Sequence, residues 1–214
     1  MEISTNRSRR ENRRQRELAG RRADAIAGAS SVFAAKGYHD AQMAEIAAEA
    51  ELSLASLYSM FGGKEEIYQE VMRAAAADVR AAVSERVAHV EGSTQRLLRL
   101  IDAFFECFEE KRDLLRIVLS GTQGLPWRIR AKMGDSAREI ADSITHWVIG
   151  LCREARSGGQ LAGLDPEAFA VSLLGAITNA AARAIEEHPD QPLTRAAPGI
   201  RAVFARVLGA EVEP

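Results

Sequence analysis

The chain has 214 residues, of which 47% are hydrophobic, so it is long enough to bury a core and too apolar for a disordered protein. Its longest apolar runs fall well short of the roughly 18 residues that span a bilayer, and its N-terminus lacks an apolar signal core. We therefore expect a cytoplasmic protein that does not enter the membrane. The two cysteines, Cys107 and Cys152, have apolar neighbours and are expected to be buried thiols rather than a disulfide.

The N-terminal segment is strongly basic. Residues 1–22 contain eight arginines against three glutamates, although the whole chain has a net charge of −2. A basic tail on an acidic body predicts a flexible arm, over residues 1–17, that binds a polyanion. The alternative is a solvated terminus that binds nothing.

Three short helices are predicted next. The first ends at Gly37, a typical helix stop. The second covers 42–50, with Asp40 as its best N-cap candidate, and the third covers 54–61, with Ser53 as its N-cap. Helical periodicity then continues through longer segments that begin near Lys64, Ser93, Asp113, Ile129, Pro166 and Leu193. We find no convincing strand, so the predicted fold class is all-α, with about nine helices.

The second and third short helices form a candidate helix-turn-helix. The major groove of B-DNA admits one α-helix, so the third helix must pack one face and expose the other. Leu57 and Phe61 can pack inward. The residues left near the open side are Leu54, Ala55, Ser56, Tyr58, Ser59 and Met60. Spacing alone does not separate this pair from the helix pairs of any small bundle.

The residues around this pair resemble a known family. The segments "FAAKGY", "M-x-E-I-A", "LYSMF" and "GKEE", within residues 26–68, are similar to the N-terminal domain of the TetR family of transcriptional regulators. The resemblance implies an all-helical homodimer. It implies a DNA-binding head over residues 18–64 and a ligand-binding and dimerisation bundle over residues 65–214.

The resemblance also implies backbone contacts with DNA. Tyr58 lies where the family usually has a phosphate-binding tyrosine, and Lys64 where it has a lysine that contacts the DNA backbone. Gln42 replaces a Thr or Ser and can still donate to a phosphate. The alternatives are a partly buried ring for Tyr58 and a solvated surface charge for Lys64.

Base reading is then expected from the exposed face of the third helix. The DNA-facing set is Ser53, Leu54, Ala55, Ser56 and Ser59, with Met60 at the edge. Leucine and alanine can touch thymine methyl groups, and serine can pair with several base edges. This helix has no Arg or Asn, so specificity is expected to depend on methyl contacts and DNA shape. The alternative is that Leu54 merely covers the core beside Leu57.

Glu51 departs from the family pattern, which commonly has glycine in this turn. A positive φ at this position would strain a glutamate backbone. Such departures make the basic arm more important for affinity. We predict that Arg9, Arg10, Arg13 and Arg14 supply sequence-independent affinity, as arginine arms do in the minor groove.

The larger bundle should hold an effector and a dimer interface. Candidates for an apolar pocket are Phe104, Phe105, Phe108, Leu115, Trp127, Met133, His146 and Trp147. The alternative for each of these residues is that its side chain belongs to the ordinary hydrophobic core. The resemblance implies that the last two helices form the homodimer interface, through Leu174, Ile177, Ala181, Val203, Phe204 and Val207. The alternative is that these helices close the core of the monomer itself.

The predicted function is a ligand-responsive transcriptional regulator, most often a repressor. It would bind a palindromic operator on double-stranded DNA as a dimer and be released by a largely apolar small molecule. We predict no catalytic residues, metal or cofactor, because none of the four histidines lies in a recognised nucleophile or metal motif. One alternative is a helical-bundle enzyme or small-molecule carrier without sequence-specific DNA binding. Another is a helical interaction protein whose arm binds RNA or membrane.

Overall fold

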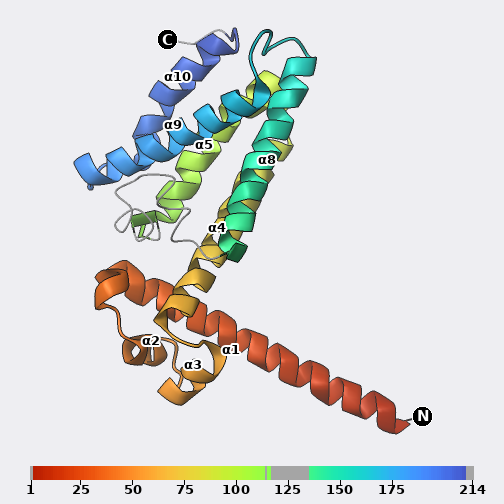
Figure 1. Cartoon of the computed structure of the whole chain (residues 1–214), viewed down its shortest axis with the longest axis vertical. Helices are drawn as coiled ribbons and strands as arrows, with labels where there is room; N and C mark the ends of the chain where they lie inside the picture. Colours follow the sequence, from red (N-terminus) through yellow and green to blue (C-terminus); the bar gives the residue numbers. More distant parts are fainter. Residues whose placement is uncertain (1, 114, 117–134, 211–214) are drawn as a thin grey trace. The chain divides into compact units, whose positions relative to one another are not determined.

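The computed structural model describes residues 2–113, 115–116 and 135–210, with side chains from residue 11 onward apart from those of residues 136 and 137. Within these ranges the regular elements are helices and no strand is present, which confirms the predicted all-α class (Figure 1). The elements are α1 (Glu2–Asp40), α2 (Met43–Glu49), α3 (Leu54–Met60), α4 (Lys64–Ala88), α5 (Ser93–Glu110), α8 (Asp135–Ser157), α9 (Pro166–Glu187), a 3-10 helix η1 (Leu193–Ala196) and α10 (Ala197–Val207).

The chain forms two compact units, which divide between Val71 and Met72. We call residues up to Val71 the head and residues from Met72 the bundle. The predicted boundary lay at residue 64, but the first turns of α4 belong to the core of the head. Ile67 and Val71 are buried there, and the ring of Tyr68 meets that of Phe33 edge to face at 5.5 Å.

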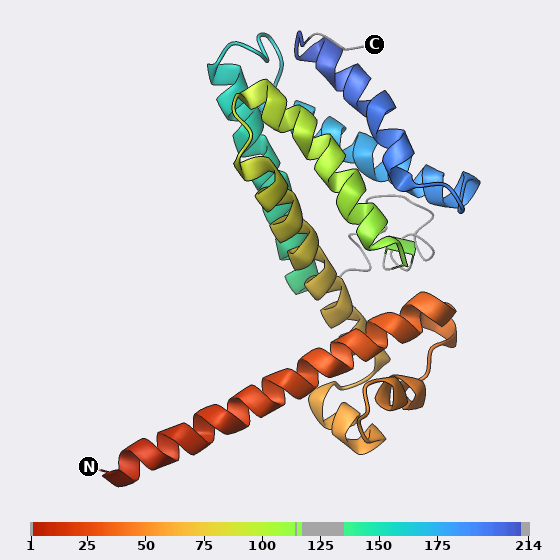
Figure 2. The same ribbon diagram turned by 180° about the vertical axis from the view of Figure 1, so that it is seen from behind.

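The head is held together by a small apolar core between α1, α2, α3 and the start of α4. Its largest fully buried side chains are Phe33, Ile46, Leu57, Phe61 and Ile67. Helix α2 lies against α1, and α3 packs against α2 (Figure 2). The close approach depends on Gly28, since a Cβ there would come within 2.9 Å of the backbone nitrogen of Ala50.

Helix α1 differs from the prediction in its first half. Residues 2–17 are helical, which corrects the expectation of a flexible segment. The segment consists mainly of good helix formers, and Arg13 pairs with Glu17 one turn later at 3.4 Å. Composition predicted the charge of this segment but not its conformation. At the other end, the positive φ of Gly37 (77°) interrupts the helix at the predicted stop.

The helix caps in the head follow the sequence in one case and not in the other. Ser53 caps α3 as predicted, because its hydroxyl accepts from the backbone N–H of Ser56 at 3.1 Å. Asp40 is not the N-cap of α2. That position belongs to Gln42, whose backbone N–H donates to Oε2 of Glu45 at 3.2 Å. Asp40 is instead the last residue of α1, and the extended backbone of Gln42 immediately precedes α2.

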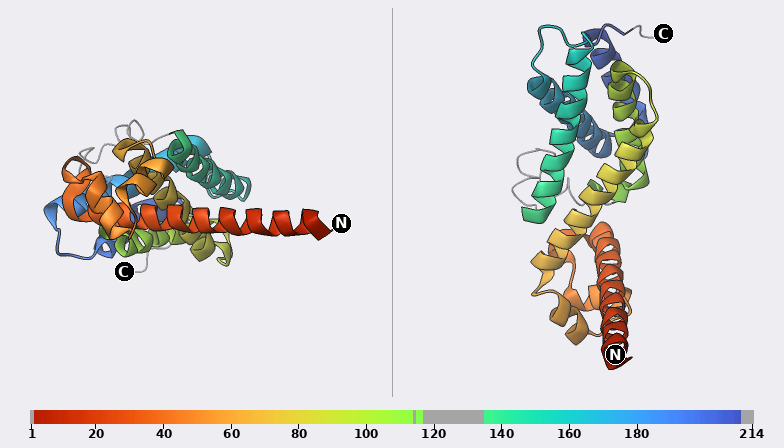
Figure 3. Two further views of the ribbon diagram at one scale, coloured as in Figure 1. Left: turned by 90° about the horizontal axis from the view of Figure 1, so that it is seen from below. Right: turned by 90° about the vertical axis from the view of Figure 1, so that its right-hand side faces the viewer.

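The bundle is built around α5, which packs against α8, α9, η1 and α10. Buried side chains of α5, such as Leu100, Ile101 and Phe105, form one core cluster with residues of the neighbouring helices. The bundle part of α4 and helix α8 lie close at one end and diverge towards the other (Figure 3), and Arg80 of α4 donates to the hydroxyl of Ser143 at 3.2 Å.

Helix α9 is long and apolar enough, by length and composition alone, to cross a membrane. Core helices of soluble proteins can be equally long and apolar, and α9 contributes Ala170, Leu173 and Ile177 to the core cluster of the bundle. Both cysteines are free and buried, as predicted. Burial raises the pKa of Cys152 to about 12, so this thiol stays protonated at neutral pH.

Candidate DNA-binding site

Helix α3 has one buried face and one open face. Leu57 on the inner face and the adjoining C-cap Phe61 are 0% and 1% exposed, whereas Leu54 and Tyr58 are 42% and 52% exposed. Ala55 and Ser59 are also exposed, and Ser56 and Met60 are half-buried. The exposure of Leu54 argues against its alternative role as a cover for the core. The helix therefore leaves a short, largely apolar surface open to solvent.

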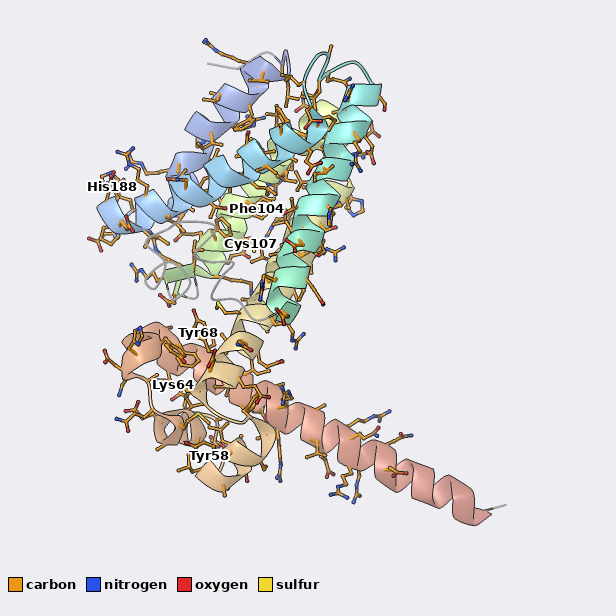
Figure 4. The ribbon with its side chains drawn as sticks, in the orientation of Figure 1. Tyr58, Lys64, Tyr68, Phe104, Cys107 and His188 are labelled. Carbon is orange, nitrogen blue, oxygen red and sulfur yellow. The ribbon has the colours of Figure 1, made fainter. Side chains whose placement is uncertain are left out.

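The serines of this surface are already hydrogen-bonded locally. The hydroxyls of Ser53 and Ser56 lie 2.8 Å apart, and the hydroxyl of Ser59 donates to the carbonyl of Ser56 at 2.7 Å. Each serine oxygen can still accept a bond, but these donors are partly committed. Tyr58, in contrast, has no hydrogen bond within the described part of the chain, so its hydroxyl is the available donor on α3 (Figure 4).

Lys64 is held by the head rather than surrounded by water. Its ammonium donates to the carbonyls of His39 and Ala41, both at 2.9 Å, and lies 4.8 Å from the ring centroid of Tyr38. The alternative of a solvated surface charge is therefore wrong. Of its three N–H donors, one remains for a DNA phosphate. That phosphate contact stays a prediction. Within the head, the lysine connects the turn between α1 and α2 to the start of α4.

The other predicted backbone contacts are exposed. Gln42 lies at the start of α2 with its side chain open to solvent. Arg13 and Arg14 are exposed on α1. The side chains of Arg9 and Arg10 lie outside the described residues. DNA contacts by all four arginines and by Gln42 stay predictions.

Glu51 adopts a left-handed backbone conformation, with φ of 55°, in the turn between α2 and α3. Among the described residues it is the one non-glycine with a positive φ. Two turn hydrogen bonds hold it there, from Glu51 N–H to Ala48 at 3.1 Å and from Leu52 N–H to Ala47 at 2.8 Å. The strain expected for glutamate at this position is present.

Replacing Glu51 by glycine should raise the free energy of unfolding of the head by about 1 kcal/mol, because glycine adopts this φ without a Cβ clash. Chemical denaturation followed by circular dichroism measures the change. Glu51→Ala is the matched control, since it removes the charge and keeps the Cβ. An equal gain in the alanine variant would show that charge, rather than backbone strain, is responsible.

The predicted effector-pocket residues are not all brought together. Phe104 and Phe105 are buried in the core cluster, and the rings of Phe104 and Phe108 lie 5.7 Å apart. Leu115 and Trp147 are half-buried against the same cluster. His146 is exposed on α8, so the prediction that it lines an apolar pocket is wrong. Trp127 and Met133 lie outside the described residues.

The predicted dimer set divides in two. Ile177 and Ala181 are 1% exposed and Phe204 is 9% exposed, with its ring against Phe169 at 5.4 Å. These three side chains belong to the core of the bundle itself, so the prediction that they lie at a dimer interface is wrong. Val203 and Val207 are exposed and Leu174 is half-buried.

The sequence reading missed Val171, which is 55% exposed on α9. It precedes the half-buried Leu174 by three residues, and that spacing was the available signal.

Comparison with known proteins supports the assignment of the head. A family model described as "Bacterial regulatory proteins, tetR family" matches residues 25–71. The HTH-type transcriptional activator FasR of Mycolicibacterium smegmatis is 28% identical over 137 residues, which cover 64% of this chain and 62% of FasR. The HTH-type regulator YdgC of Bacillus subtilis is 28% identical over 96 residues, which cover 43% of this chain and 49% of YdgC. The chain thus spans about half to three-fifths of these relatives.

Solved structures share the fold over most of the chain. FadR of Bacillus subtilis, in complex with stearoyl-CoA, has a TM-score of 0.74 at 18% identity and covers 85% of this chain and 96% of its own. PfmR of Thermus thermophilus, a TetR-family regulator, has a TM-score of 0.65 at 25% identity and covers 89% of this chain and 99% of its own. Residues 25–71 thus match the head of TetR-family regulators, and the chain as a whole shares the helical architecture of a solved TetR-family regulator.

Proposed function

We propose that this protein is a cytoplasmic, ligand-responsive repressor that binds a palindromic operator as a homodimer. The observation that carries the proposal is the two-faced helix α3, with Leu57 buried and Leu54 and Tyr58 open. A helix in this state can enter the major groove without disturbing the core behind it. The match of residues 25–71 to TetR-family regulators supports the same reading.

Contacts on this surface divide by type. The hydroxyl of Tyr58 is suited to a phosphate oxygen, which would fix the register of α3 on the duplex. Leu54 and Ala55 offer apolar contacts to thymine methyl groups. Because the serine donors are partly engaged, direct readout would use few hydrogen bonds, and DNA shape would supply part of the specificity.

The open apolar side of α9 and α10 supports a second copy of the chain as partner. Val171, Val203 and Val207 are about half exposed or more, and only 39% of the most apolar stretch of α9 is buried. A two-fold dimer would place its two α3 helices about one DNA turn apart, near 34 Å. A palindromic operator follows from that symmetry.

For the effector we propose a long-chain acyl thioester. The support is the aromatic and aliphatic interior of the bundle, around Phe104 and Phe108, and the stearoyl-CoA in the structure of FadR, which has the same fold. Binding would favour a dimer in which the two α3 helices no longer fit successive grooves. FasR is named an activator, and in vitro transcription distinguishes the repression proposed for this protein from activation.

The test is footprinting of the protein on the DNA upstream of its own gene, with in vitro transcription from that promoter. We expect a palindromic protected region that stearoyl-CoA abolishes. Tyr58→Phe should weaken operator binding about tenfold, since it removes one hydrogen bond to a charged oxygen and keeps the ring.

Tyr68→Phe is the control for this loss. It removes a phenol from a half-buried ring on α4, and burial raises the pKa of that phenol. Operator binding should be unchanged in this variant. Absence of protection on any genomic fragment, with or without stearoyl-CoA, would favour the enzyme or carrier alternative instead.

A further inference from the structure

Arg22 on α1 contacts the end of α3 in two ways. Its NH1 donates to the carbonyl of Met60, the last residue of α3, at 2.8 Å. Its guanidinium carbon lies 4.3 Å from the ring centroid of Phe61, the C-cap of the same helix. A side chain 38 residues earlier in the chain therefore forms the C-terminal cap of α3.

The short helix needs such a cap. Helix α3 has seven residues and no basic residue in its last turn. The last carbonyls of an α-helix lack partners within the helix, and a cation near them interacts favourably with the helix dipole. Arg22 supplies both a donor and a positive charge at this end, while Ser53 supplies the cap at the other.

A third contact extends the cap to α4. NH2 of Arg22 lies 3.6 Å from Oε1 of Glu70, and the two side chains are 38% and 22% exposed. One guanidinium thus joins α1, the end of α3 and the first turns of α4 within the head. The planar fork of arginine allows a hydrogen bond, stacking on a ring and an ion pair at once, which an ammonium group cannot reproduce.

We propose that Arg22 is a positioning residue for DNA recognition, which holds the axis of α3 so that Leu54 and Tyr58 meet the groove. This inference rests on the proposed function, because it concerns the same surface. Arg22 would act through α3 and would make no DNA contact of its own.

The test measures the affinity of the full-length protein for operator and for non-specific duplex DNA, over a range of salt concentrations. Arg22→Ala should weaken operator binding at least tenfold and leave the slope of log affinity against log salt unchanged. Arg22→Lys should lose most of the same affinity although it keeps the charge. Arg21→Ala, which removes an exposed charge from the same turn, should retain the ratio of operator to non-specific affinity.

Four results would overturn the inference. If Arg22→Lys restores wild-type affinity, or if Arg22→Ala flattens the salt slope by about 0.9, the residue is a phosphate contact. If both variants bind the operator as the wild type does, α3 needs no such cap. If the wild type itself binds no operator, the proposed function fails and this role fails with it. Should Arg22→Ala not fold, the lysine variant, with circular dichroism as the check, decides.

Discussion

Deleting residues 1–16 should flatten the dependence of log operator affinity on log salt by about 0.9 for each phosphate that the segment neutralises. If Arg9, Arg10, Arg13 and Arg14 each bind one phosphate, the slope should change by about 3.6. The protein would then lose sequence-independent affinity, and its preference for the operator over other DNA would change little. Filter binding or fluorescence anisotropy across a salt series measures both quantities.

The structure favours backbone contacts over threading of the minor groove. Residues 2–17 are part of α1, and residues 11–21 are all exposed. Because the backbone of a helix is already ordered, little further conformational entropy is lost when its side chains bind phosphates. Since the side chains of residues 11–16 are exposed, deletion of the segment should leave the free energy of unfolding nearly unchanged.

A charge-neutral variant separates charge from helix. Glutamine at positions 9, 10, 13 and 14 keeps the length and the helix propensity of the segment and removes four charges. It should reproduce the slope change of the deletion. A flattened slope in the deletion alone would assign the effect to the helix rather than to its arginines, and an unchanged slope in both would contradict a DNA role for the segment.

The local parts of this fold could be predicted from the sequence. Ser53 as N-cap, Gly37 as a stop and the inward positions of Leu57 and Phe61 depend on residues a few positions apart. The family resemblance rested on the same short segments, which is why it identified the head. The strain at Glu51 was foreseen for the same reason, since one turn position decides it.

The long-range parts could not be predicted. Arg22 and Met60 lie 38 positions apart, and Lys64 binds carbonyls more than 20 positions earlier, so both contacts exist only once the helices have packed. Helix α9 is apolar on more than one side, and periodicity cannot say which side meets α5 and which stays open. For that reason Ile177 is expected at a dimer interface from the sequence and is found in the core.

Replacing Phe105 by alanine should lower the free energy of unfolding of the bundle by about 3–5 kcal/mol. Phe105 is 0% exposed on α5, the helix that packs against α8, α9, η1 and α10. Its removal would leave a cavity in the close-packed core cluster of the bundle. Since whole domains are stable by only about 5–15 kcal/mol, the variant should be close to unfolding at ambient temperature.

Urea denaturation followed by circular dichroism provides the measurement, and Leu164→Ala, at an exposed leucine of the same unit, provides the control, with an expected change within about 0.5 kcal/mol. The same variant tests the two readings of this aromatic cluster. A wall of an open effector pocket would tolerate truncation without ligand and lose stearoyl-CoA binding. A core residue would lose stability first. If Phe105→Ala lowers the free energy of unfolding by less than about 1 kcal/mol and abolishes effector binding, Phe105 lines the effector pocket rather than the core.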